Sequence, residues 1–216
     1  MATEGAFSAP AIGSMDAAGG VSPQGVVETM HGTVLPTLFQ QALGAAFFWT
    51  APCVRRLHSV RGQARYRGLC DIECGTSPLA RLCARAAGLP AAGAAVPTTV
   101  TFDAGQKGET WRRDFAGKPM VSRLEYRDGL LCERLGPMQF RFFLHASEDG
   151  GLWWQVAGVR LFGLLPVPVK LFDGVRCRER EHDGRYEFLV EAALPLAGLI
   201  VRYEGWLVPE AADDGV

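Results

Sequence analysis

The chain has 216 residues, a formal net charge of −1 and 21 % charged residues. This near-neutral composition excludes a strongly basic protein that binds nucleic acid, and it provides no net field toward an anionic membrane. The length and the 48 % hydrophobic content suit one soluble globular domain with a sizeable core.

The first 31 residues are rich in Ala, Gly, Ser and Pro without periodicity, which predicts a disordered tail over residues 1–31. The domain is expected over residues 33–209, with a second short tail at 210–216. No secretory signal and no transmembrane segment are expected. The six cysteines are interpreted as reduced thiols of a cytoplasmic protein and not as a metal site, because the usual C-x-x-C spacing is missing. No Gly-rich dinucleotide fingerprint follows a predicted strand, so no cofactor is expected.

Two helical regions are expected in the N-terminal half. Apolar residues at helical spacing begin at Thr33, which can cap a helix that should end before Pro52, and a short helical turn follows over residues 54–58. The second helix has Ser77 at its N-cap, Pro78 in its first turn and Gly88 after its end. Its predicted buried stripe consists of Leu79, Leu82, Cys83 and Ala86.

Four Asp-Gly dipeptides, flanked mostly by alternating apolar and polar residues, predict consecutive β-hairpins: Asp128-Gly129, Asp149-Gly150, Asp173-Gly174 and Asp183-Gly184. Strands are expected at 62–74, 97–103, 108–115, 119–127, 130–135, 138–147, 151–160, 174–182, 185–194 and 199–208. The predicted fold class is α+β, mainly β: a long antiparallel meander of about ten strands curled into a barrel or half-barrel, with the two helices covering one side. A two-sheet sandwich is the alternative.

The apolar segment 161–172 contains Pro166 and Pro168, which remove ladder donors, so a loop or an edge is expected there. Burial over the barrel end is the favoured interpretation. A lid, a docking surface and a membrane-touching tip are the alternatives.

Five residues are candidates for ligand binding. Trp111, Arg113 and Phe115 share one face of a predicted strand, which places a guanidinium between two aromatic rings. Glu133 lies on an apolar strand face and can pair with Arg113, either as an ion pair that sets register or as a polar anchor of a cavity. Tyr203 occupies one face of the last predicted strand.

The histidines form no metal-spaced or triad-like cluster. His58 ends the first helical region beside two arginines, so a solvated position at a helix C-terminus is expected for it. Surface or packing roles are therefore predicted for the histidines.

Several blocks of the chain resemble one bacterial family. The most specific is Trp111-Arg112-Arg113-Asp114-Phe115-Ala116-Gly117, and further blocks are Tyr66-Arg67-Gly68, Gly151-Leu152-Trp153-Trp154 and Tyr203-Glu204-Gly205-Trp206-Leu207. They resemble a bacterial domain of unknown function that occurs alone or fused C-terminal to reductases similar to saccharopine dehydrogenase. The resemblance covers residues 33–209 and implies, through the fusion, a role near small-molecule or lipid metabolism.

Three functions are compatible with these patterns. The leading hypothesis is a module that binds a lipid-like or other apolar small molecule in a barrel cavity. The second is a docking domain for a separately encoded reductase. The third is a cyclase- or isomerase-like enzyme that uses an interior Glu/Arg pair, and binding without catalysis is favoured over it.

Overall fold

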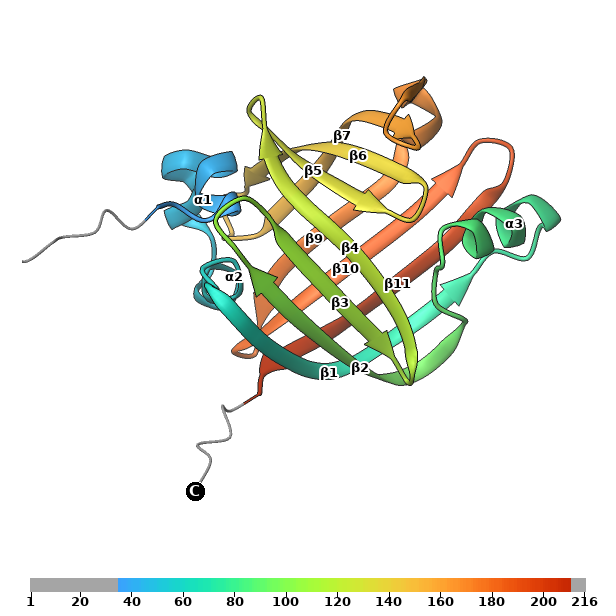
Figure 1. Ribbon diagram of the computed structural model, residues 1–216. Coiled ribbons are helices and arrows are strands. Elements are labelled where there is room, and N and C mark those ends of the chain that lie inside the picture. Colours follow the sequence, from blue (N-terminus) through green and yellow to red (C-terminus); the bar gives the residue numbers. More distant parts are fainter. Residues whose placement is uncertain (1–34, 211–216) are drawn as a thin grey trace, which may run out of the picture. The chain divides into compact units, whose positions relative to one another are not determined.

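A computed structural model describes residues 35–210 of the chain (Figure 1). The predicted tail at 1–31, the predicted cap Thr33 and residues 211–216 lie outside the described residues. None of the helices within 35–210 is both long and apolar enough to cross a membrane.

One antiparallel sheet closes on itself. Its strands are β1 (Gly62–Cys74), β2 (Gly93–Ala104), β3 (Glu109–Phe115), β4 (Lys118–Arg127), β5 (Leu130–Leu135), β6 (Met138–Ala146), β7 (Leu152–Leu161), β8 (Leu165–Val167), β9 (Gly174–His182), β10 (Arg185–Leu194) and β11 (Gly198–Pro209). Neighbours in the sheet follow the order β6-β5-β4-β3-β2-β1-β11-β10-β9-β7-β8, and an additional β6–β7 pairing completes the ring. The prediction of a closed, mainly β barrel is confirmed, and the half-barrel and the sandwich are excluded.

The hairpin turns explain why the strand boundaries agree closely with the sequence. Asp128-Gly129 and Asp183-Gly184 both have positive φ at both central residues, the backbone that matches the twist of the flanking strands. Asp173-Gly174 does not form a hairpin, because a 3₁₀ helix, η2 (Val169–Phe172), precedes it.

The segment 161–172 is an edge hairpin and not a plain loop. Phe162-Gly163 forms a tight turn with positive φ. Within residues 35–210, β8 pairs only with β7, so Pro166 needs no second partner. Phe172 is buried, whereas Leu164 and Leu165 are 79 % and 61 % exposed. The expectation that this segment is buried over the barrel end is therefore wrong for most of its length.

The first helical region covers one end of the barrel in three short pieces: α1 (Leu38–Leu43), η1 (Gly44–Trp49) and α2 (Pro52–Leu57). Thr37 caps α1, in a capping box with Gln40. The helix does not continue to Pro52, because Gly44 takes a φ of +56°. Phe39, Phe47 and Val54 are buried against the barrel wall.

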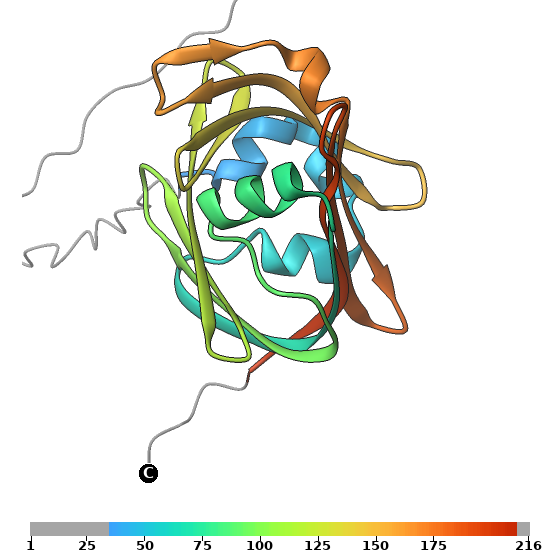
Figure 2. The same ribbon diagram turned by 90° about the vertical axis from the view of Figure 1, so that its right-hand side faces the viewer.

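The second helix, α3 (Pro78–Ala86), lies at the opposite end of the barrel (Figure 2). Ser77 and Pro78 begin it as predicted. The predicted buried stripe is wrong for Leu79 and Leu82, which are 42 % and 64 % exposed, because α3 packs through the small face of Ala80 against β11 and the β10–β11 turn. The two helical regions therefore cover two ends, not one side together.

The β1–β11 contact depends on two glycines. A Cβ on Gly68 would lie 1.8 Å from the carbonyl oxygen of Trp206, and one on Gly205 would lie 2.2 Å from that of Leu69. Side chains are excluded at both positions, since no Cβ approaches a backbone oxygen so closely.

Candidate functional site

The barrel encloses a cavity of about 330 Å³ that is bounded by α3 at one end and by the packed first helical region at the other. This volume is within the range of small-molecule sites. At the inner end its wall is buried, as at Phe102, Trp111 and Leu207, whereas near α3 its wall is partly exposed, as at Leu135 and Met138. The cavity therefore has a floor near α1 and α2 and a mouth beside α3.

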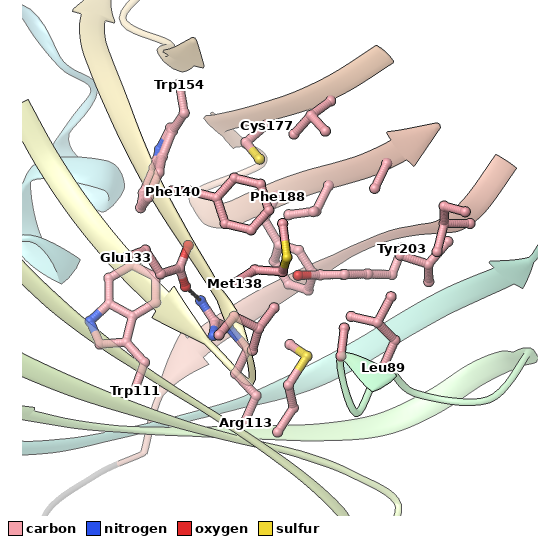
Figure 3. A pocket seen from close by; sticks show the side chains of 18 of the residues that line it. Leu89, Trp111, Arg113, Glu133, Met138, Phe140, Trp154, Cys177, Phe188 and Tyr203 are labelled. Carbon is pink, nitrogen blue, oxygen red and sulfur yellow. Dashed lines mark hydrogen bonds and ion pairs between the residues drawn. The ribbon is translucent and has the colours of Figure 1, made fainter. Parts of the chain in front are cut away.

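The wall is mostly apolar, and its polar groups gather in the middle (Figure 3). Arg113 of β3 extends into the cavity, where its Nη2 lies 3.4 Å from Oε1 of Glu133 on β5. Its Nη1 donates a hydrogen bond of 2.8 Å to Ser122 Oγ, and its guanidinium carbon lies 4.9 Å from the centroid of the Trp111 ring. Both charged side chains are 13 % exposed.

All five residues predicted from the sequence line this cavity. Trp111 lies near the floor, Arg113 and Glu133 lie in the middle, and Phe115 and Tyr203 pack edge to face at 5.7 Å. Strand alternation brings them inside together, because Trp111, Arg113 and Phe115 share the parity that faces the barrel axis.

The floor carries a second buried polar pair, which was not predicted. His58 Nε2 lies 2.5 Å from Oε2 of Glu179, and the two side chains are 1 % and 6 % exposed. The expectation of a solvated His58 is wrong, because α2 folds under the barrel and the Phe39 ring stacks on the imidazole at 3.6 Å. Among residues 35–210, His58 Nδ1 has no hydrogen-bond partner.

Glu109 begins β3 with the same inward parity as Trp111, and Trp111 Nε1 donates a 2.9 Å hydrogen bond to its Oε2. Burial raises the pKa of the Glu109 carboxyl, while the Trp111 hydrogen bond and nearby His58 oppose the rise. The bond holds the indole of Trp111 in one orientation, with its ring against Arg113.

Three weaker acids also face the cavity. Burial raises the pKa of the Cys177 thiol, and the carboxylates of Glu133 and Glu179 raise it further. Burial likewise raises the pKa of the Tyr186 phenol, and the Glu179 carboxylate raises it further. Burial also raises the pKa of the Tyr203 phenol. The thiol and both phenols therefore stay protonated at neutral pH and can donate hydrogen bonds.

The sequence of β9 contains a signal for the position of Glu179. Arg176, Arg178 and Arg180 alternate there with Cys177 and Glu179, so the parity of the cysteine indicates that Glu179 points inward. Nothing comparable marks His58, since its position depends on how α2 folds under the barrel.

This arrangement suits a ligand that is apolar along most of its length and has one polar group. The apolar wall removes hydrocarbon from water, and Arg113, Glu133 and Tyr203 present donors and acceptors for a polar group. Because the positive charge of Arg113 is balanced by the negative charge of Glu133, an uncharged hydrogen-bonding group fits this pair better than a free anion.

The chain matches the family model described as "Domain of unknown function (DUF4166)" over residues 51–207. No curated protein matches the sequence. The matched range runs from α2 into β11, so it includes every strand except the last two residues of β11, and all the residues that line the cavity. Since the match spans well over half of the chain, the protein belongs to the DUF4166 family.

Proposed function

We propose that the protein binds a mostly apolar small molecule, such as a lipid-like compound, in the barrel cavity. The observation that carries the proposal is the open, apolar cavity of about 330 Å³ with the Arg113–Glu133 pair in its middle. A barrel that served only as a scaffold would gain stability by filling this space with side chains.

Arg113 and Glu133 are proposed as polar anchors, with Trp111, Phe115 and Tyr203 as the apolar and hydrogen-bonding surroundings of the head group. Trp111 and Ser122 hold the guanidinium in place before any ligand arrives. Such preorganisation lowers the entropy cost of binding.

Native mass spectrometry of the purified protein, paired with solvent extraction, tests the proposal. We expect a stoichiometric apolar adduct, either co-purified or acquired from a cell lipid extract. The double substitution Arg113→Met with Glu133→Met should weaken adduct binding about tenfold or more, because charge-assisted hydrogen bonds to the head group are lost. Both partners are replaced so that no unpaired charge stays buried.

Arg112→Gln is the matched control, because Arg112 is the exposed neighbour on the same strand. It should leave the adduct unchanged. An unmodified protein mass after incubation with the extract would refute the proposal and favour a docking role toward a protein such as a reductase. An adduct chemically different from every compound supplied would instead favour catalysis in the cavity.

A further inference from the structure

Exposed apolar side chains gather around the mouth of the cavity. They come from three segments that meet at the α3 end of the barrel: α3, the β10–β11 turn, and the stretch from the β7–β8 turn through η2 (Figures 1 and 2). We call these residues the mouth rim: Leu79, Leu82, Phe162, Leu164, Leu165, Val169, Leu171 and Leu196.

The mouth rim is not part of the core. Leu196 is 88 % exposed, Leu164 79 % and Leu82 64 %. Single exposed leucines are common on protein surfaces, but several on segments that border one opening mark a surface that contacts an apolar partner.

A row of arginines without acidic partners runs across the outer face of β4–β7 toward the β7–β8 hairpin. Arg123 of β4 lies directly opposite Arg134 of β5, and Gln139 of β6 connects Arg134 to Arg160 of β7. Within residues 35–210, no acidic side chain lies within 4.0 Å of the guanidinium groups of Arg123, Arg134 and Arg160. Like charges directly opposite each other destabilise a sheet, so a surface that keeps them suits an anionic partner.

The opposite wall has no such excess. Arg176, Glu191, Arg202 and Glu73 occupy successive cross-strand positions of β9, β10, β11 and β1, so their signs alternate. The like-charged cross-strand row of β4–β7 therefore has no counterpart at these positions of the opposite wall.

Further basic residues lie close to the mouth. α3 carries Arg81 and Arg85 and no acidic residue, and Lys170 lies in η2 among the rim leucines. Asp173 is the acidic residue that follows η2. Apolar side chains bordered by basic ones fit the interface of an anionic bilayer, in which leucines enter the acyl region and arginines contact phosphates.

We propose that the mouth rim and the arginine row seat the barrel on an anionic phospholipid bilayer, with the mouth facing the lipid. The inference rests on the proposed function, since it gives an apolar ligand a path between bilayer and cavity that avoids water. α3 lies across this path and contributes Cys83 and Ala86 to the cavity wall, so its position controls the width of the opening.

Vesicle flotation with the purified full chain tests the docking. Vesicles of phosphatidylcholine mixed with phosphatidylglycerol should carry the protein, whereas pure phosphatidylcholine should carry far less, and added salt should weaken binding. Leu164→Glu should lower binding about tenfold, because it places a charge in the acyl region. Arg134→Gln and Arg160→Gln should each lower it about fivefold.

The controls use the other faces of the barrel. Arg176→Gln makes the same charge change on the wall where charges alternate, and Trp49→Glu replaces a 70 % exposed aromatic at the opposite end. Both should bind vesicles as the parent does. Loss of binding in Trp49→Glu but not in Leu164→Glu would overturn the inference.

Two other results would also overturn it: equal binding to both vesicle types, or no vesicle binding together with a dimer that Leu164→Glu dissociates. The latter would assign the mouth rim to a second copy of the chain.

Vesicle binding does not require a filled cavity, so Arg113→Met with Glu133→Met should still float with anionic vesicles. Failure of docking and failure of ligand binding are therefore separate observations.

Discussion

Glu109 is a carboxyl group enclosed by the barrel wall, 7 % exposed and bonded to the Trp111 indole. Its pKa is raised above the ordinary value of 4.5, with burial as the largest cause. The folded state therefore binds more protons than the unfolded state between pH 4.5 and the raised pKa. In that window, stability decreases as the pH increases.

Glu109→Gln should remove this pH dependence. The amide keeps an acceptor for Trp111 Nε1 and carries no charge, so the free energy of unfolding should decrease less from pH 4.5 toward neutrality than it does in the parent. Urea unfolding at a series of pH values measures the difference. Parallel pH profiles for parent and variant would mean that another group causes the decrease.

Residue parity was readable from the sequence, but the environment of each residue was not. Alternation placed Trp111, Arg113 and Phe115 on one face, and closure of the barrel made that face the interior. His58 could not be placed, since its burial depends on α2 folding beneath β9 and on the Phe39 ring that covers the imidazole.

At the scale of elements, turns were the most predictable features. Asp128-Gly129 and Asp183-Gly184 form tight hairpins through local backbone preference, so the strands that flank them could be placed from the sequence. Asp173-Gly174 precedes β9 without forming a hairpin. The break at Gly44 and the exposed stripe of α3 were missed because tertiary packing decides them. Leu79 and Leu82 have helical periodicity but face away from the barrel, and small residues make the actual contact.

The β1–β11 contact should be highly sensitive to substitution. Gly68→Ala should lower the free energy of unfolding by about 3 kcal/mol, because its Cβ would overlap the carbonyl oxygen of Trp206 and separate the strands. Gly158→Ala is the matched control, since its Cβ would meet Arg141 Cδ at 3.6 Å, an ordinary contact. Gly158→Ala should change stability by less than about 1 kcal/mol. The midpoints of urea unfolding measure the stability of both variants. Similar midpoints for Gly68→Ala and Gly158→Ala would contradict the close approach of β1 and β11 at Gly68.

At the scale of the whole molecule, side chains that fill the cavity should raise the free energy of unfolding and reduce the space for a ligand. Ala192 of β10 lines the cavity wall, and Ala192→Leu places a larger apolar side chain at that wall. The variant should be more stable by on the order of 1 kcal/mol in the absence of ligand and should capture less adduct. Ala193→Leu, at the neighbouring position outside the cavity lining, should leave adduct capture unchanged.

Thermal unfolding and native mass spectrometry together check this prediction. A variant that is stabilised and still fully loaded would show that the ligand binds elsewhere. The opposite directions expected for stability and loading also separate a steric effect from simple misfolding.

The β1–β11 ladder, which pairs Tyr66 with Pro209, joins the first and the last strand of the chain. β1 is therefore synthesised long before its second partner, and the ring cannot form until β11 has left the ribosome. Contacts so distant in sequence make folding slow. Until then, the free edge of β1 and the apolar concave face of the unfinished sheet are open to chaperones and to other nascent chains, so the yield of folded protein depends on how quickly the last strand arrives.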